Sequence, residues 1–237
     1  MVRDVHGEAA GAAYEGYVGN RGNFTDPGDR GRAERLDRPH SVYLQTLTRQ
    51  WATAPAEIGA NALSIAAVVR TTPKTREIRF LHTRETYEEK GHASACVTAM
   101  KDDTPAGHSL ATHYAACNTR LSALFYLSLG FRADIASCSA DLPQPGSLTP
   151  GGSSQMTFMW TRPPEEEEAA ACVEHLAFVK YVRAKQASRR SDSATDFVAG
   201  LDRVIAKLER NLGSAHRLAV RTPPATPPSR GSKRPRT

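Results

Sequence analysis

The sequence predicts an α/β (α+β) fold, with a central sheet, flanking helices and disordered N- and C-terminal tails. Three patterns carry this prediction. Apolar and polar residues alternate over residues 76–83 as in a strand, and small apolar residues fill Ala93–Met100 as in a helix packed on a sheet. An apolar stripe then follows helical spacing from Phe197 to Leu212. The 237 residues suffice for one ordinary domain plus tails.

The first 40 residues are rich in Gly, Asp, Arg and Ala and show no hydrophobic period. Because so little apolar surface is available to offset the entropy of ordering, residues 1–40 are predicted to be disordered. A single folded domain is predicted over residues 41–213. It starts with a helix from Ser41, a favourable N-cap residue, to about Trp51, since apolar residues recur between them at helical spacing.

A β-hairpin is predicted next. The apolar run 62–69 is typical of a buried strand, residues 71–74 form a turn, and residues 76–83 return as the second strand. After a polar turn, Gly91 precedes the helix predicted over Ala93–Met100. A glycine turn that opens a helix presents free backbone N–H groups, so this position suits an anion.

The C-terminal part is predicted to hold two strands and two helices. The first strand follows Phe131 to about residue 137, a Pro- and Gly-rich loop covers 139–154, and the second strand covers 156–161. Proline and four glutamates then favour the start of a helix over about 163–187, with Val173, Leu176 and Val179 on its apolar face. The last helix, about 192–212, ends at Gly213, and its apolar face docks on the core or on a partner chain.

The net charge of +6 lies in the tail. Residues 213–237 hold no acid and six basic residues, Arg217, Arg221, Arg230, Lys233, Arg234 and Arg236. The body is therefore close to neutral and lacks interleaved aromatic and basic residues, so sequence-specific nucleic-acid binding is not expected. There is no run of 18 apolar residues and no signal-peptide core, which predicts an intracellular chain without a membrane partner.

The four cysteines lie far apart, with no Cys-x-x-Cys pair, so no metal site is expected. Cys96 and Cys172 fall on predicted apolar helix faces and are expected to be buried free thiols. The eight histidines are scattered and are interpreted as surface or structural groups. Asp102 and Asp103 are interpreted as part of a solvated turn after a helix.

The tail, residues 214–237, is predicted to be disordered and carries two kinds of signal. Lys233-Arg234-Pro235-Arg236 is similar to a short nuclear-import signal, which would bind an import receptor; the alternative is a solvated solubilising tail. Candidate phosphorylation sites, which would make host or viral kinases partners, are Thr222, Thr226, Ser188, Ser191 and Ser193.

Residues 60–161 resemble the GNAT acyl-CoA N-acyltransferases. Glu88–Ala93 is similar to that family's Arg/Gln-x-x-Gly-x-Gly/Ala turn, and Asn118–Phe131, which contains Leu129-Gly130-Phe131, is similar to its N-x-x-A-x-x-L-Y-x-x-L-G-F motif. The resemblance implies a mixed sheet and acetyl-CoA as cofactor if the site is functional. It also implies cofactor-binding residues, namely Lys90, Gly91, His92, Ala93 and Asn118. Tyr126 would be the general acid.

Two departures from the motif favour a degenerate site. Glu88 stands where the family has Arg or Gln, and a carboxylate repels phosphate. Asn118 lies one residue further from Tyr126 than usual. Glu77 or Glu85 is the nearest candidate base, and an exposed charge at a strand edge is the alternative for both. No bound cofactor is therefore expected unless the site is functional.

The chain as a whole resembles a family of small alphaherpesvirus nuclear phosphoproteins, encoded by the third gene of the unique-long region. The residues that carry this resemblance are Tyr43–Arg49, Thr72–Glu85 and Met100–Pro105. It implies location in the host nucleus, phosphorylation and no established enzymatic activity. We therefore expect a degenerate GNAT-like scaffold that binds host or viral nuclear proteins; the alternative is an active acyl-CoA-dependent N-acyltransferase.

Overall fold

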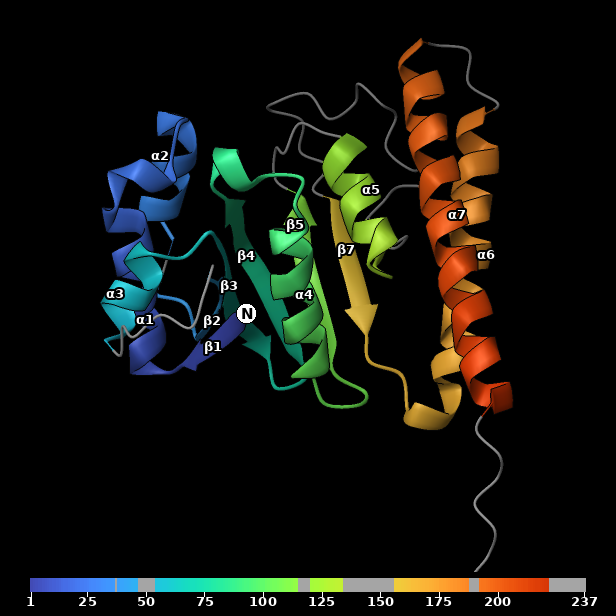
Figure 1. Ribbon diagram of the computed structural model, residues 1–237, viewed down its shortest axis with the longest axis horizontal. Helices are drawn as coiled ribbons and strands as arrows, with labels where there is room; N and C mark the ends of the chain where they lie inside the picture. Colours follow the sequence, from blue (N-terminus) through green and yellow to red (C-terminus); the bar gives the residue numbers. More distant parts are fainter. Residues whose placement is uncertain (37, 47–53, 115–119, 134–155, 188–191, 222–237) are drawn as a thin grey trace, which may run out of the picture.

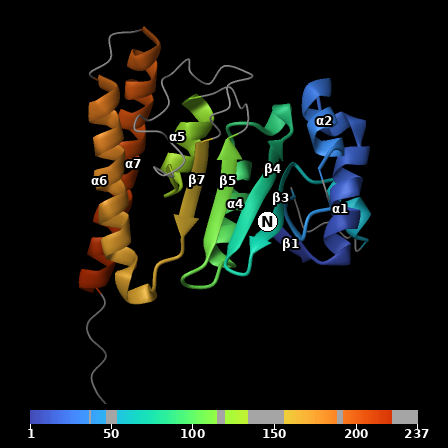
Figure 2. The ribbon, with the colours of Figure 1, turned by 180° about the vertical axis from the view of Figure 1, so that it is seen from behind.

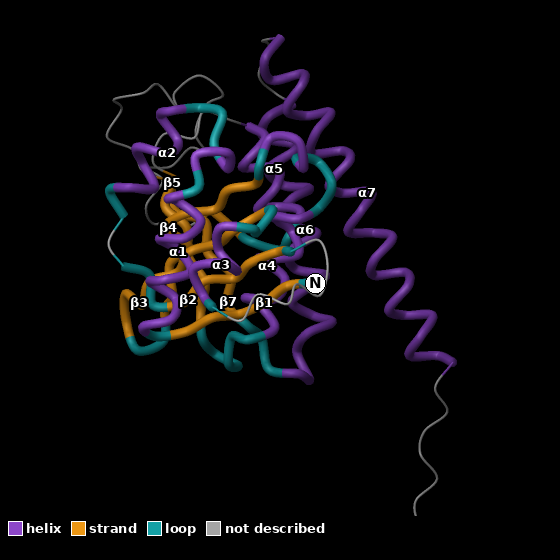
Figure 3. The backbone as a smooth tube through the Cα atoms, turned by 60° about the vertical axis from the view of Figure 1, so that its left-hand side comes forward, coloured by secondary structure: helices purple, strands orange, loops and turns teal. Residues whose placement is uncertain are grey.

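The computed structural model describes residues 1–36, 38–46, 54–114, 120–133, 156–187 and 192–221. They form a seven-stranded sheet, in the order β1-β2-β3-β4-β5-β7-β6, with helices on both faces (Figure 1). The tube view shows the strands inside and the helices around them (Figure 3). The predicted α/β class is confirmed.

The strands are β1 (Val2–His6), β2 (Ser41–Gln45), β3 (Ser64–Thr72), β4 (Thr75–Thr83), β5 (Ser109–Tyr114), β6 (Arg132–Ala133) and β7 (Met156–Thr161). The α-helices are α1 (Glu8–Gly19), α2 (Pro27–Glu34), α3 (Pro55–Ala60), α4 (His92–Asp102), α5 (Arg120–Ser128), α6 (Glu168–Ala187) and α7 (Asp192–Arg221). Short 3-10 turns are η1 (Arg21–Asn23), η2 (Glu85–Tyr87) and η3 (Glu165–Glu167).

The sheet is mixed because β4 and β5 are parallel while the other neighbouring strands are antiparallel. The predicted hairpin is confirmed, since β3 and β4 pair around the turn at residues 73–74. β6 and β7 form the second antiparallel pair. The strand expected after Phe131 is only Arg132–Ala133 within the described residues, and the loop predicted over 139–154 lies outside them.

The helix predicted from Ser41 to Trp51 is wrong, because Ser41–Gln45 is the strand β2. Val42 and Leu44 are buried on one face of the sheet and Tyr43 on the other. A strand covered on both faces buries consecutive residues, and the resulting apolar run also fits helical spacing. Residues 47–53 lie outside the described part of the chain.

The core is divided by the sheet into two clusters. The α4-side cluster contains residues of α4, α5, α6 and α7, among them Met100, Tyr126, Val179 and Leu201, together with Tyr43 of the sheet. The α1-side cluster contains residues of α1, α2 and α3 together with Val42, Leu44, Ile65 and Ala67. In Figures 1 and 2, α1–α3 stand at one end of the molecule and the paired α6 and α7 at the other.

The prediction that residues 1–40 are disordered is wrong. β1 pairs with β2 along its length, and α1 buries Ala10, Ala13, Tyr14 and Tyr17 at helical spacing. This face combines two large aromatic rings with alanines, and the small residues let the helix approach α3 closely. The Gly- and Ala-rich composition of residues 1–40 hides this mode of packing.

Core docking of the last helix is confirmed, because Phe197, Leu201 and Val204 are buried in the α4-side cluster. The predicted end at Gly213 is wrong, since α7 continues to Arg221. Glycine inside a helix costs only about 1 kcal/mol relative to alanine, and the helix formers that follow it favour continuation. The tail after residue 221, including Thr222, Thr226 and residues 233–236, lies outside the described residues.

Candidate functional site

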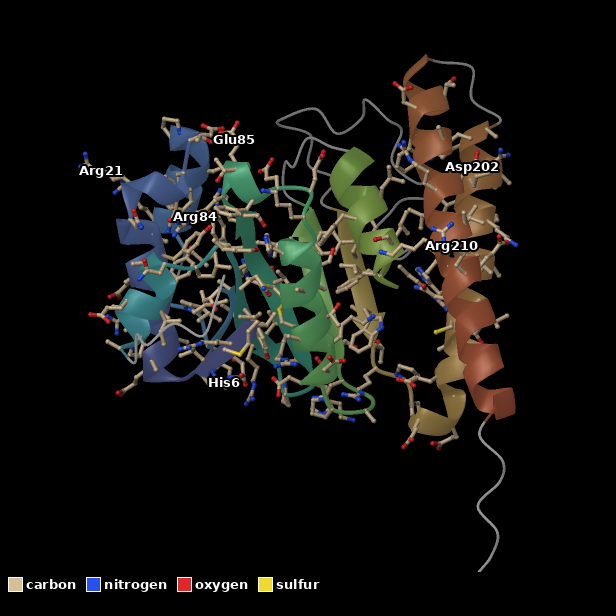
Figure 4. All side chains as sticks on the ribbon, in the orientation of Figure 1. His6, Arg21, Arg84, Glu85, Asp202 and Arg210 are labelled. Carbon is tan, nitrogen blue, oxygen red and sulfur yellow. The ribbon has the colours of Figure 1, made fainter. Side chains whose placement is uncertain are left out.

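The candidate site lies where the two parallel strands separate. β4 and β5 pair only through Thr75, Arg76 and Glu77 of β4, yet β4 continues to Thr83. In open α/β sheets, ligands bind beyond the carboxyl ends of parallel strands at points where the chain leaves in different directions. Figure 4 labels Arg84 and Glu85, which directly follow β4 at this end of the sheet.

A β-bulge in β4 adjoins the separation. Ala67 of β3 pairs with Phe80 and Val68 pairs with Ile78, so Arg79 is the additional residue in β4. A bulge redirects the local backbone and is common beside functional sites. The Arg79 guanidinium forms an ion pair of 2.9 Å with the carboxylate of Glu77.

The sequence left two interpretations of Glu77, a candidate base or an exposed charge at a strand edge. The second interpretation is wrong. The residue is only 2% exposed, since β3 and β5 flank it on both sides. Glu85, in contrast, is exposed in η2. Of these two carboxylates, Glu77 is the one held at the strand separation.

The N-terminus of α4 follows this edge of the sheet and has the predicted glycine turn. Gly91 has φ of 80°, a left-handed conformation that favours glycine, and no side chain caps the helix. The amide of Ala95 donates to the Gly91 carbonyl, so the amides of residues 92–94 are the ones without a partner inside the helix. These amides are the groups that could bind an anion.

The residues before Gly91 make this approach acidic. Glu88 and Glu89 are exposed, and Glu89 itself has a positive φ of 59°. The Lys90 ammonium donates to the carbonyl of Thr86 at 2.8 Å and lies 5.0 Å from the centre of the Tyr87 ring. Lys90, the basic residue of this turn, is thus bound to the preceding segment.

The predicted cofactor residues are only partly brought together. Lys90, Gly91, His92 and Ala93 are consecutive at the start of α4, with the His92 ring 6.1 Å from the Tyr87 ring. Asn118 lies outside the described residues. Four of the five predicted cofactor residues therefore lie together at the start of α4.

Tyr126, the candidate general acid, is a core residue of α5. It is 6% exposed, and its ring centre lies 5.2 Å from that of Phe131 and 5.9 Å from that of Phe158. A general acid must reach the departing group in the reacting complex. The packing against Phe131 and Phe158 accounts for an aromatic ring at this position.

In the sequence, His82 is one of eight scattered histidines. Its surroundings in the fold make it a candidate site residue. Its Nδ1 forms a hydrogen bond of 2.8 Å with the Tyr17 hydroxyl, and its ring lies 4.7 Å from the ring of Phe24. Burial lowers the pKa of His82, so the imidazole is neutral near pH 7 and its ring nitrogens can accept a proton or a hydrogen bond. The neighbours Tyr17 and Phe24 come from distant parts of the chain, so the sequence alone contained no signal for His82.

Asp103 lies in an exposed turn directly after α4, as predicted, and it also takes part in a polar network. Tyr43 donates its hydroxyl hydrogen to Asp103, and the Arg76 guanidinium contacts the same carboxylate at 2.9 Å. Burial opposes ionisation, yet the hydrogen bonds from Tyr43 and Arg76 lower the pKa of Asp103 overall. This network joins β2, β4 and the end of α4, and we assign it a structural role.

The two described cysteines differ. Cys96 is buried, as predicted, and burial raises the pKa of its thiol to about 12, so it stays protonated. Cys172 is exposed, which contradicts the expected burial, because α6 turns His175, Val179 and Val182 toward the core instead. Cys117 and Cys138 lie outside the described residues.

Three of the remaining predicted sites have no structural description. Ser188, Ser191 and the segment 233–236 are outside the described residues, whereas Ser193 lies in the first turn of α7. In the described ranges, no group of three or more His, Cys, Asp or Glu side chains is placed to hold a metal ion. No helix in those ranges is both long and apolar enough to cross a membrane.

Solved structures with a similar arrangement are acetyltransferases. A protein described as a GNAT-family acetyltransferase from Desulfovibrio desulfuricans gives a TM-score of 0.44 at 13% identity, covering 68% of this chain and 98% of its own. The ribosomal-protein-S18-alanine N-acetyltransferase of Escherichia coli gives 0.40 at 15%, covering 69% and 94%. A Bacillus subtilis acetyltransferase in complex with CoA gives 0.36 at 18%, covering 68% and 99%.

At these scores the likeness concerns the arrangement of the chain and assigns no activity or ligand. No protein-family model matches the chain, and no curated protein matches it in sequence. The comparisons therefore lend no support to the alphaherpesvirus resemblance.

Proposed function

We propose that this chain is an interaction protein built on a GNAT-like scaffold, and that it does not transfer acyl groups efficiently. The observation that carries this proposal is the acidic approach to α4, where Glu88 and Glu89 are exposed and Lys90 is bound to Thr86. A pyrophosphate at the α4 amides would meet two carboxylates at close range without a free cation from this turn. Carboxylates near a helix N-terminus also satisfy the helix dipole themselves.

The proposal is tested by a thermal-shift titration of the natural protein with acetyl-CoA, because a ligand that binds only the native state raises its melting temperature. We expect no shift. Glu88→Arg removes one repulsive charge and adds an attractive one, so it should bind acetyl-CoA more tightly, with at least a ~tenfold lower Kd. Glu57→Arg, the same charge change on the exposed part of α3, is the control.

Two results would contradict the proposed scaffold function. If the natural protein binds acetyl-CoA at micromolar concentration and Tyr126→Phe abolishes turnover while leaving that binding intact, the chain is an enzyme and the scaffold proposal is wrong. If Glu88→Arg and Glu57→Arg improve binding equally, the effect is one of net charge, and the argument from the α4 turn fails.

The second candidate function is acyl-CoA-dependent N-acylation. Three features favour it: the separation of β4 from β5, the uncapped glycine turn, and a neutral His82 bound to Tyr17. In this alternative, acetyl-CoA is the cofactor and His82 takes a proton from the attacking amine. His82→Gln should then lower kcat at neutral pH and leave the Kd of acetyl-CoA unchanged.

We further propose that the chain acts in the nucleus of a cell infected by an alphaherpesvirus and is phosphorylated there. The motifs quoted above support the viral assignment, and the basic segment 233–236 supports binding of an import receptor. Host or viral kinases would modify Ser188, Ser191, Ser193, Thr222 or Thr226, and each phosphate would add about −1.5 to −2 charges to a basic region. Mass spectrometry of the protein from infected cells tests this; complete lack of modification at these sites contradicts it.

A further inference from the structure

The outward face of α6 carries an apolar stripe that nothing in the described structure covers. Its buried side is formed by His175, Val179, Val182 and Gln186. The opposite side shows five exposed apolar residues at spacings of three and four, Ala170, Val173, Ala177, Tyr181 and Ala184. Val173 is 57% and Tyr181 is 53% exposed, and they are two of the four large apolar residues exposed among those described.

The stripe is symmetric about Ala177. If a second α6 lies antiparallel across it, Ala177 meets its own copy, Val173 meets Tyr181, and Ala170 meets Ala184. Small residues at the centre let the helices approach closely, and the larger Val173 and Tyr181 fill the space on either side. Such a self-complementary patch is what a twofold dimer requires, because each surface must match itself.

The charge along α6 selects the same antiparallel arrangement. Residues 163–176, which cover η3 and the first part of α6, carry five glutamates, at positions 165–168 and 174, and no lysine or arginine. The segment after Ala177, as far as residue 187, carries Lys180, Arg183 and Lys185 and no acid. An antiparallel partner therefore places the acidic half of each helix against the basic half of the other, whereas a parallel partner aligns like charges.

Several of these charges already have partners within the chain but remain exposed at the rim. Lys180 pairs with Glu209 and Glu174 with Arg132, but all four side chains remain at least 40% exposed. Lys185 lies over the ring of Tyr181 at 5.6 Å, so an approaching carboxylate would reach a lysine already held beside the stripe. Exposed pairs of this kind contribute little on their own and can be rearranged.

We propose that the protein forms a twofold dimer in which the α6 stripe of one chain packs antiparallel on that of a second copy. This inference does not depend on the proposed scaffold function, since an active acyltransferase could dimerise in the same way. It concerns a surface at the opposite end of the molecule from α1–α3 (Figure 2).

The first test is sedimentation equilibrium of the full chain, which should show a monomer–dimer equilibrium. Ala177→Glu places two like charges on the twofold axis and should weaken association at least ~tenfold. Because Ala177 is exposed, this variant should keep its melting temperature when diluted to the monomer. A natural chain that remains monomeric at high micromolar concentration overturns the proposal, as does an Ala177→Glu variant that associates normally.

The second test distinguishes antiparallel from parallel packing. In a Cys172→Ser background, Ala177→Cys should form an intermolecular disulfide under mild oxidation, because the residue faces its own copy. Val173→Cys is the matched control on the same exposed stripe and should cross-link poorly, since it faces Tyr181 of the other chain. Equal cross-linking of both variants indicates a parallel pair, and cross-linking of neither places the dimer, if any, elsewhere; both results contradict the proposal.

Discussion

His175 joins α6 to α5 through a buried hydrogen bond. Its Nε2–H donates to the carbonyl of Leu127 at 2.8 Å, while Nδ1 is buried with no hydrogen-bond partner among the described residues. Burial lowers the pKa of His175, since the protonated ring would place a second N–H where no acceptor lies. Nearby Arg132 and Lys101 act in the same direction.

The lowered pKa of His175 makes the stability of the fold depend on pH. Because the folded pKa lies below the unfolded value of about 6.5, the unfolded chain binds more protons, and stability falls as pH drops through that value. We expect His175→Gln, which keeps an amide donor but does not titrate, to lose less stability than the natural chain between neutral and acid pH. Denaturation midpoints at several pH values measure this, with the exposed His40→Gln as control. Parallel curves for His175→Gln and the natural chain contradict the assignment.

At the residue scale, the sequence predicted the parts of the site that depend on local backbone. The turn at Gly91 was predictable, because a glycine between a polar turn and an apolar run is typical of a helix start. The burial of Glu77 and the exposure of Cys172 were not, because both depend on which neighbour covers the residue. His82 becomes conspicuous only when the fold brings Tyr17, Phe24 and Phe80 around it.

At the scale of elements, the two described glycines with the least room for a side chain lie where α1 crosses α3. A methyl group added at Gly59 would lie 1.8 Å from the carbonyl oxygen of Ala13, and one at Gly16 would lie 2.1 Å from that of Ala56. The two helices therefore touch through their backbones, and no side chain can rotate away to make room. Glycine is required here by contact rather than by its own conformation.

Substitution at this crossing should separate the helices. We expect Gly59→Ala to lower the free energy of unfolding by about 1–3 kcal/mol, the usual range for an overpacked core. Gly19→Ala is the matched control, since its added methyl group meets nothing within 4 Å and alanine favours the helix. Urea denaturation measures both changes. Equal stability of the two variants would show that α1 and α3 are not packed this closely.

The same crossing explains why the N-terminal elements were missed. Glycine and alanine lower the apparent hydrophobicity of residues 1–40, although they are the residues that permit the close approach. β4 was predictable from its alternation, and β3 from an apolar run that a Thr-Pro-Lys turn joins to β4. β2 was not, because a strand buried on both faces has no alternation to distinguish it from a helix.

At the scale of the whole molecule, the charge is uneven, and the basic C-terminal segment is proposed to direct nuclear import. We expect that replacing Lys233, Arg234 and Arg236 with alanine moves the protein from the nucleus to the cytoplasm, because an import receptor binds clustered positive charge. A tandem fluorescent fusion is the appropriate reporter, since the 25.7 kDa chain alone is small enough to diffuse through nuclear pores.

The control for this import experiment must remove the same charge from elsewhere in the chain. Arg21, Arg70 and Lys74 are exposed on the folded domain, so their combined replacement by alanine lowers the net charge by the same amount without touching the tail. If import depends on the clustered sequence, this control stays nuclear while the tail variant does not. If both variants leave the nucleus, net charge rather than a signal governs the distribution; if neither does, another segment directs import, and the role proposed for residues 233–236 is wrong.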